Sequence, residues 1–125
     1  MTALVEQTCV PYIDEKSQAT FEELRTLRAE VPNWRIVYQA SVPHLERSYD
    51  FPDFQRALAF AEHISKIAEQ EHHYPAVTVE WGKVTVTWWT QAVQWLHRND
   101  FVMAAKTDRA YQPANLIRAI EPVEL

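Results

Sequence analysis

The chain has 125 residues and a formal net charge of −5 at pH 7, which fits one domain with a modest core. No run reaches the roughly 20 apolar residues that a membrane span needs, and the scattered Lys and Arg residues lack the clustering that nucleic-acid binding requires. The only glycine is Gly82, which excludes the glycine-rich loops that hold nucleotide phosphates. Because the first residues also lack the features of a secretory signal and Cys9 has no disulfide partner, we expect a cytoplasmic protein.

The N-terminal region divides into an arm and a helix. Residues 1–18 show no sustained period and contain Pro11, so we interpret them as an extended N-terminal arm. Thr20 and Glu23 have the spacing of a capping box, in which each side chain pairs with the other residue's backbone amide. Apolar residues follow at helical spacing as far as Pro32, which cannot continue a helix. A helix is therefore predicted between Thr20 and Pro32.

A β-hairpin is predicted after this helix. Residues 34–40 and 44–51 alternate as strands do, and residues 41–43 are the predicted loop.

The next helix is predicted over residues 50–72, with Asp50 as its N-cap and Asp53 at the third position. It carries one wide apolar face and a narrower stripe, Phe60 and Ile67, roughly 100° away. Two interpretations are open: the helix is deeply buried, or Phe60 and Ile67 contact a second subunit. The wide face comprises Phe54, Ala57, Leu58, Ala61, Ile64 and Ala68.

A second hairpin and a last helix complete the pattern. Residues 76–90 alternate strictly around Gly82, which tolerates the positive φ of a tight turn. The last helix is predicted to begin at Asn99 as its cap, with Asp100 in its first turn. The order α-β-β-α-β-β-α predicts an α+β two-layer domain, with a four-stranded antiparallel sheet and its helices on one face. The domain is expected over residues 19–112.

The remaining residues, 113–125, are interpreted as a C-terminal tail. Its three larger apolar residues could form a short amphipathic turn between two prolines.

The histidines are the first candidates for chemistry. Metal binding is disfavoured, because adjacent histidines on a strand point to opposite faces and no HExxH-like pair exists. An acid/base site is favoured instead, since His73 before a strand and Asp100 at a helix start can titrate or hydrogen-bond beside an aromatic pocket. The metal-ligating residue types considered were His63, His72, His73, His97, Glu69 and Glu71.

A longer motif extends this constellation. An acidic residue, a histidine, a proline, an aromatic residue and a later aspartate occur in this order across 32 residues. Their spacing matches a known family pattern with no insertion or deletion. With the segments EWGKVTVTWWT and LHRNDFVMAAKTD, this register makes residues 20–111 resemble the pterin-4a-carbinolamine dehydratase family. The resemblance implies that His73 and Asp100 are catalytic positions. It also implies a pterin pocket formed by Glu69, Tyr74, Pro75, Trp81, Thr90 and Gln91.

The resemblance further implies a fold, a reaction and an assembly state. The family fold has the same α-β-β-α-β-β-α order. The family reaction converts 4a-hydroxytetrahydropterin to quinonoid dihydropterin and water without a metal or organic cofactor. A dimer through the sheet is implied, with a tetramer through the second helix as an alternative, where Phe60 and Ile67 would supply the contact.

Two positions depart from the family pattern. His73 keeps the first family histidine, but Tyr74 and Gln91 stand where two further histidines are expected. A tyrosine titrates at about 10 and suits a base near neutrality poorly, and a glutamine exchanges no proton usefully. We therefore expect the site to have lost most of its capacity for acid/base catalysis. His72 is not expected to substitute, because strand alternation would turn it away from His73.

These departures favour a non-catalytic binding or assembly factor on the dehydratase scaffold. In its most specific version, this hypothesis makes the protein similar to the RuBisCO assembly factors of α-carboxysomes. Its client would then be RuBisCO or another protein, and it would associate with the carboxysome. The alternative is an active dehydratase in pterin recycling with a pterin as its ligand. Fold alone does not decide between them.

Overall fold

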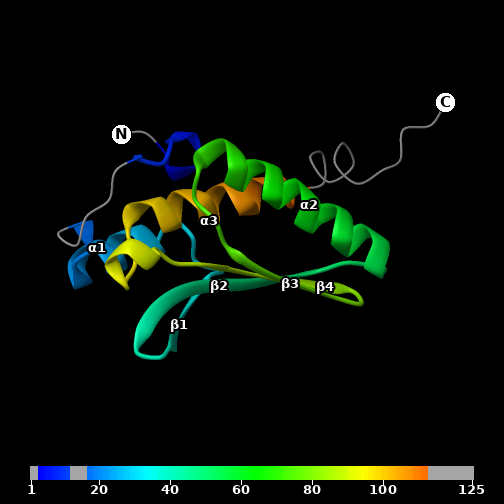
Figure 1. Ribbon diagram of the computed structural model, residues 1–125, viewed down its shortest axis with the longest axis horizontal. Coiled ribbons are helices and arrows are strands. Elements are labelled where there is room, and N and C mark those ends of the chain that lie inside the picture. The colour runs from blue at the N-terminus through cyan, green and yellow to red at the C-terminus, as the bar shows by residue number, and fades with distance from the viewer. Residues whose placement is uncertain (1–2, 12–16, 113–125) are drawn as a thin grey trace.

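The computed structural model describes residues 3–11 and 17–112. Four strands form one antiparallel sheet in the order β1-β2-β4-β3. Helices α2 and α3 cover one face of the sheet, and α1 packs against α3 (Figure 1). The predicted α+β fold with a four-stranded antiparallel sheet is confirmed. In chain order the elements, with η for a 3-10 helix, are η1 (Leu4–Glu6), α1 (Phe21–Arg28), β1 (Arg35–Gln39), β2 (Val42–Asp50), α2 (Phe54–Glu71), β3 (Ala76–Glu80), β4 (Lys83–Trp88), η3 (Gln91–Val93) and α3 (Arg98–Ala110).

Helix α1 begins with the predicted capping box. The Thr20 amide donates to Glu23 Oε1 at 2.9 Å, and the Glu23 amide donates to Thr20 Oγ1 at 3.1 Å. These two bonds satisfy amides that have no partner inside the helix. The helix ends at Arg28, short of Pro32, and a turn then carries Val31 into the core.

The two hairpins turn through residues with positive φ. Ala40 and Ser41 have φ of 50° and 68°, which makes a two-residue turn between β1 and β2. The predicted loop of residues 41–43 is therefore one residue too long, because Val42 and Pro43 already belong to β2. Two-residue turns with positive φ are favoured in hairpins because they match the twist of the flanking strands. Gly82 has φ of 75°, as expected, and a Cβ there would lie 3.2 Å from the Phe51 carbonyl oxygen.

The caps of α2 and α3 differ from the prediction. Asp53 caps α2 by accepting from the Arg56 amide at 2.8 Å, because β2 continues through Asp50 and leaves that residue in the sheet. His97, rather than Asn99, caps α3: its Nδ1 accepts from the Asn99 amide at 2.9 Å.

The narrow stripe of α2 belongs partly to the core. Phe60 is fully buried inside the chain, and its ring lies 5.1 Å from the rings of both Tyr49 and Phe51. The prediction that Phe60 contacts a second subunit is therefore wrong, because the side of α2 that carries Phe60 packs against the aromatic side chains at the end of β2. Ile67 is half-buried against the same core. The apolar side chains that α2 exposes are those of Phe54 and Leu58.

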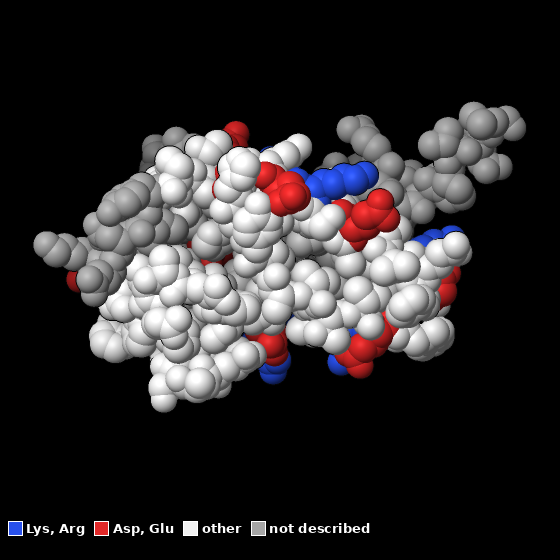
Figure 2. Space-filling model, viewed as in Figure 1, with Lys and Arg blue, Asp and Glu red and all other residues white. Residues whose placement is uncertain are grey.

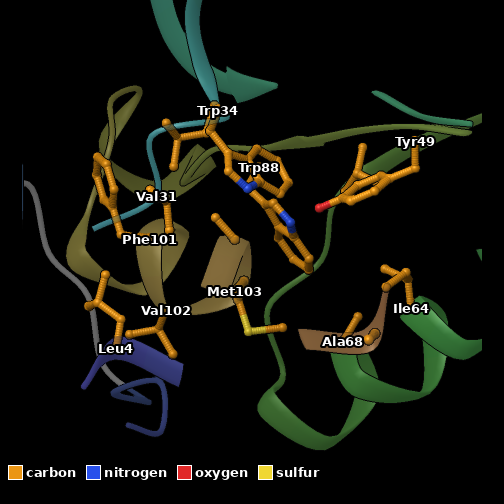
Figure 3. Packing of buried hydrophobic residues seen from close by; sticks show 14 of the residues in the cluster. Leu4, Val31, Trp34, Tyr49, Ile64, Ala68, Trp88, Phe101, Val102 and Met103 are labelled. Carbon is orange, nitrogen blue, oxygen red and sulfur yellow. The ribbon is translucent and has the colours of Figure 1, made fainter. Parts of the chain in front are cut away.

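The largest buried side chains meet between the sheet and α3 (Figure 3). Asp108 of α3 joins this core to β2, because its Oδ1 accepts from Trp34 Nε1 at 2.9 Å, Arg47 Nη1 at 2.6 Å and Tyr49 Oη at 2.6 Å. The Arg47 guanidinium also lies 4.5 Å from the centre of the Tyr49 ring. Burial, and then the Asp108 carboxylate, raise the pKa of Tyr49, so its hydroxyl remains a donor.

The described surface carries mixed charges. In Figure 2, acidic and basic side chains lie next to one another in a few small groups on this face, and most of the surface between the groups is uncharged. None of the described helices combines the length and apolar character needed to cross a membrane.

Replacing Asp108 with alanine should destabilise the fold. The change leaves a half-buried guanidinium, an indole N–H and a hydroxyl without their shared acceptor, so we expect a loss of about 2 to 4 kcal/mol in the free energy of unfolding. Urea unfolding followed by tryptophan fluorescence measures it. As a control, Glu80→Ala removes an exposed pair with Lys83 and should change stability by about 0.5 kcal/mol or less. Equal effects of both variants would contradict the role of Asp108.

The cap of α3 should make stability depend on pH. Burial lowers the pKa of His97 below its ordinary value of 6.5, with Asp100 and Glu23 opposing the shift and His73 and Arg98 adding to it. Because the folded pKa is the lower one, the unfolded chain binds more protons between the two values. Stability should therefore fall as the pH drops below about 6.5, as the unfolded His97 becomes protonated.

A comparison with His97→Asn isolates this contribution, because asparagine caps helices without titrating. Urea unfolding at about pH 7.5 and about pH 5.5 should show a larger loss of stability for the wild type than for the variant. His63, whose pKa burial also lowers, contributes equally to both proteins. An identical loss in the two proteins would exclude His97 as the titrating cap.

Candidate active site

The structure brings two predicted site residues together at the N-terminus of α3. His73 Nε2 lies 2.6 Å from Asp100 Oδ1. Asp100 Oδ2 also accepts from Thr90 Oγ1 at 2.8 Å and from the His97 amide at 2.9 Å. Asp100 is fully buried and His73 is 8% exposed. The carboxylate thus accepts at every contact and fixes the orientation of the imidazole.

The backbone at the end of α2 explains how His73 reaches this position. His72 adopts the left-handed conformation with φ of 54° and ψ of 39°, which ends the helix. The His73 amide then donates to the Ala68 carbonyl at 3.2 Å, a bond typical of a helix C-terminus. The His73 ring stacks on Trp88 of β4, with 5.9 Å between ring centres and 10° between planes. His73 is held from three sides before β3 begins.

An open cavity of about 330 Å³ lies beside this pair. Its volume is at the lower end of the range for small-molecule sites. Two aromatic side chains, those of Trp89 and Tyr74, border it together with several polar side chains. The cavity is lined by His72, His73, Tyr74, Pro75, Trp89, Thr90, Gln91 and Ala92.

His72 borders the same cavity as His73, contrary to expectation. Strand alternation was the reason for turning it away, but β3 begins only at Ala76. His72 sits at the left-handed cap of α2 instead, where alternation has no meaning. The site therefore has two imidazoles at its edge, one buried and one exposed.

Tyr74 and Glu69 form a pair at the rim. The interaction of the Tyr74 hydroxyl with the Glu69 carboxylate is the main reason that the pKa of Tyr74 is raised. Tyr74 therefore stays protonated near neutrality and can donate a hydrogen bond, but it is unsuited to act as a base. Glu69 is outside the lining of the cavity, although the resemblance placed it in the pocket.

Trp81 lies away from the cavity. It is 77% exposed at the β3–β4 turn, and the whole of β3 separates it from the cavity-lining Pro75. Its assignment to the pocket of this chain is therefore wrong. Trp89 is the aromatic wall instead, with its ring 4.4 Å from that of His44. No sequence pattern indicates Trp89, because β4 ends at Trp88 and strand alternation does not extend beyond it.

The remaining predicted residues have mixed positions. Pro75 and Thr90 line the cavity, and Thr90 also bonds to Asp100 as described. Gln91 lies in η3 at the cavity with an exposed side chain. Within the described residues, no group of three or more His, Cys, Asp or Glu side chains is arranged to hold a metal ion.

The chain is similar to proteins of one family along most of its length. Residues 17–110 match the family model described as pterin 4 alpha carbinolamine dehydratase. A relative from Microcystis aeruginosa, named "Putative pterin-4-alpha-carbinolamine dehydratase", is 46% identical over 92% of this chain and 99% of its own length. Relatives with the same name from Chlorobium limicola and Saccharophagus degradans are 44% and 43% identical over 86% and 90% of this chain, and cover 95% and 99% of their own lengths.

A solved structure has the same arrangement of elements. The crystal structure of a transcriptional coactivator/pterin dehydratase from Brucella melitensis superposes with a TM-score of 0.67 at 25% identity, covering 74% of this chain and 96% of that one. The family match, the identity to these relatives and the similarity to this solved structure all indicate the same family. The chain therefore belongs to the pterin 4 alpha carbinolamine dehydratase family.

Proposed function

We propose that the protein is a dehydratase that removes water from a 4a-hydroxytetrahydropterin, as part of pterin recycling. One observation carries the proposal: His73, oriented by a buried carboxylate, borders the same cavity as His72 and Trp89. Relatives 43 to 46% identical that are named for this activity support it.

The reaction needs two proton transfers and no change in oxidation state. The 4a-hydroxyl takes up one proton and leaves as water, while the pterin ring gives up one proton. One group must therefore accept a proton and another must donate one. Histidine suits both roles, because it titrates near neutrality.

We assign one transfer to His73 and the other to His72. Asp100 holds Nε2 of His73, so Nδ1 is the ring nitrogen that exchanges a proton with the substrate. His72 takes the role that a further family histidine would have, from an exposed position at the edge of the cavity. Asp100 stabilises the imidazolium that forms when His73 accepts a proton.

The cavity walls suit a flat, polar heterocycle. Trp89 and Tyr74 offer aromatic surface on which a pterin ring can pack. The Gln91 amide can both donate and accept, which matches the alternating polar edge of a pterin. In this assignment Tyr74 and Gln91 bind the substrate, and the histidines move protons.

A second candidate function is favoured by those same two side chains. Tyr74 and Gln91 replace family histidines and cannot exchange protons near neutrality. In this alternative the scaffold is a non-catalytic, cytoplasmic assembly factor, a dimer or tetramer whose client is RuBisCO or another protein, with an association with carboxysomes. We place it second, because a buried histidine–carboxylate pair beside an open cavity is better explained by proton transfer.

The purified protein should accelerate the loss of chemically generated 4a-hydroxytetrahydropterin, measured by absorbance. His73→Ala and His72→Ala should each lower the rate by roughly 10² to 10⁴-fold, because each removes a positioned proton-transfer group. His63→Ala is the matched control, since His63 lies on α2 outside this cavity, and should retain the wild-type rate. A wild-type rate equal to that in buffer would exclude the dehydratase, and an unchanged His72→Ala would remove His72 from the mechanism.

Co-expression with RuBisCO tests the second candidate. An assembly factor should raise the yield of soluble, assembled RuBisCO measured by native gel electrophoresis, and His73→Ala should preserve that gain because no proton transfer is involved. The same yield with and without this protein would reject the assembly role.

A further inference from the structure

The N-terminal arm runs along α3 toward the active site. Leu4 is 2% exposed and lies beside Val102 of α3 (Figure 3). Lys106 Nζ donates to the Val5 carbonyl at 3.0 Å. Figure 1 shows this dark-blue segment against α3. The described part of the arm is thus packed on the domain, and it includes a short 3-10 helix where an extended chain was expected.

Asn99 pairs with the arm through both of its amide atoms. The Val10 amide donates to Asn99 Oδ1 at 3.0 Å, and Asn99 Nδ2 donates to the Val10 carbonyl at 3.1 Å. The side chain of Asn99 therefore binds one backbone residue as a neighbouring strand would. Asn99 is 2% exposed and directly precedes Asp100.

Glu71 pairs with the preceding residue of the arm. The Cys9 amide donates to Glu71 Oε1 at 2.7 Å. Burial, and then Glu71, raise the pKa of the Cys9 thiol to about 12, so thiolate chemistry is not the role of this segment. Glu71 is the last residue of α2 and stands two positions before His73.

Two consecutive residues of the arm therefore bridge the two segments that carry the His73–Asp100 pair. Apolar packing between α2 and α3 is non-directional and tolerates small shifts. Hydrogen bonds fix position more tightly. The 2.6 Å bond between His73 and Asp100 needs that precision, because shifts of about 1 Å are costly to catalysis.

We propose that Cys9 and Val10, held by Glu71 and Asn99, form an arm clamp that sets the spacing of His73 and Asp100. Glu71 and Asn99 are positioning residues, which act on the reaction through this pair. The kinetic part of this inference rests on the proposed dehydratase function, whereas the structural part concerns the pair itself. Both parts are testable on the full-length chain.

The test compares Asn99→Ala with Lys106→Met. Asn99→Ala removes both bonds to Val10 and keeps the cap of α3, which uses the Asn99 backbone amide. Lys106→Met removes the bond of the same arm to Val5, farther from the site, and keeps the apolar stem. Both variants loosen the arm, but only Asn99→Ala opens the clamp.

Two readouts are expected to separate these variants. By NMR, the Nε2-bound proton of His73 should broaden or shift in Asn99→Ala and remain as in the wild type in Lys106→Met. The kcat of Asn99→Ala for 4a-hydroxytetrahydropterin should fall by about tenfold or more, with KM changed by about twofold or less, because the cavity walls are retained. Glu71→Gln, which keeps the acceptor for Cys9, should behave as wild type, and Glu71→Ala should resemble Asn99→Ala.

The clamp is rejected if the His73 resonance is the same in Asn99→Ala and the wild type. It is also rejected if Lys106→Met changes that resonance equally, since the arm would then stabilise only the fold. If the wild type has no dehydratase activity, the proposed function fails and the NMR comparison still decides the clamp. If Asn99→Ala does not fold, the comparison of Glu71→Ala with Glu71→Gln decides it.

Discussion

The Asp100 carboxylate is the contact on which the site depends. It accepts from the His73 imidazole, the Thr90 hydroxyl and the His97 amide, so it joins the end of α2, the segment after β4 and the start of α3. A fully buried carboxylate is costly unless each oxygen is paired, and here both oxygens are. The same bonds that make its burial tolerable therefore fix the geometry of the imidazole.

A second carboxylate on α3 joins this helix to β2. Asp108 accepts from Trp34, Arg47 and Tyr49, and it lies two turns along the helix from Asp100. One helix thus anchors the site near its N-terminus and the core near its C-terminus. Among the described residues, no buried side-chain nitrogen or oxygen lacks a hydrogen-bond partner. This explains how a small domain can hold a buried polar pair next to an open cavity.

The site has a rigid half and an adaptable half. His73 and Asp100 are held by packing and several bonds. His72, Tyr74 and Gln91 border the cavity with exposed side chains, where a substitution leaves the core untouched. Tyr74 and Gln91, where the sequence resemblance leads us to expect histidines, both fall in this second half. Under the proposed function, the buried pair supplies the fixed proton-transfer group and the exposed residues supply the part of the site that can vary.

Local patterns in the sequence determined the element order, the capping box at Glu23, the turn at Gly82 and the motif that contains His73, because each depends only on neighbouring residues. The tertiary structure decided the rest. Phe60 is buried because the rest of the domain covers a wider part of the α2 surface than the apolar face predicted from helical periodicity. Trp81 projects from a hairpin turn. His72 borders the cavity because its own backbone adopts the left-handed conformation at the end of α2. Burial and side-chain direction depend on which surfaces meet, and a one-dimensional pattern does not contain that information.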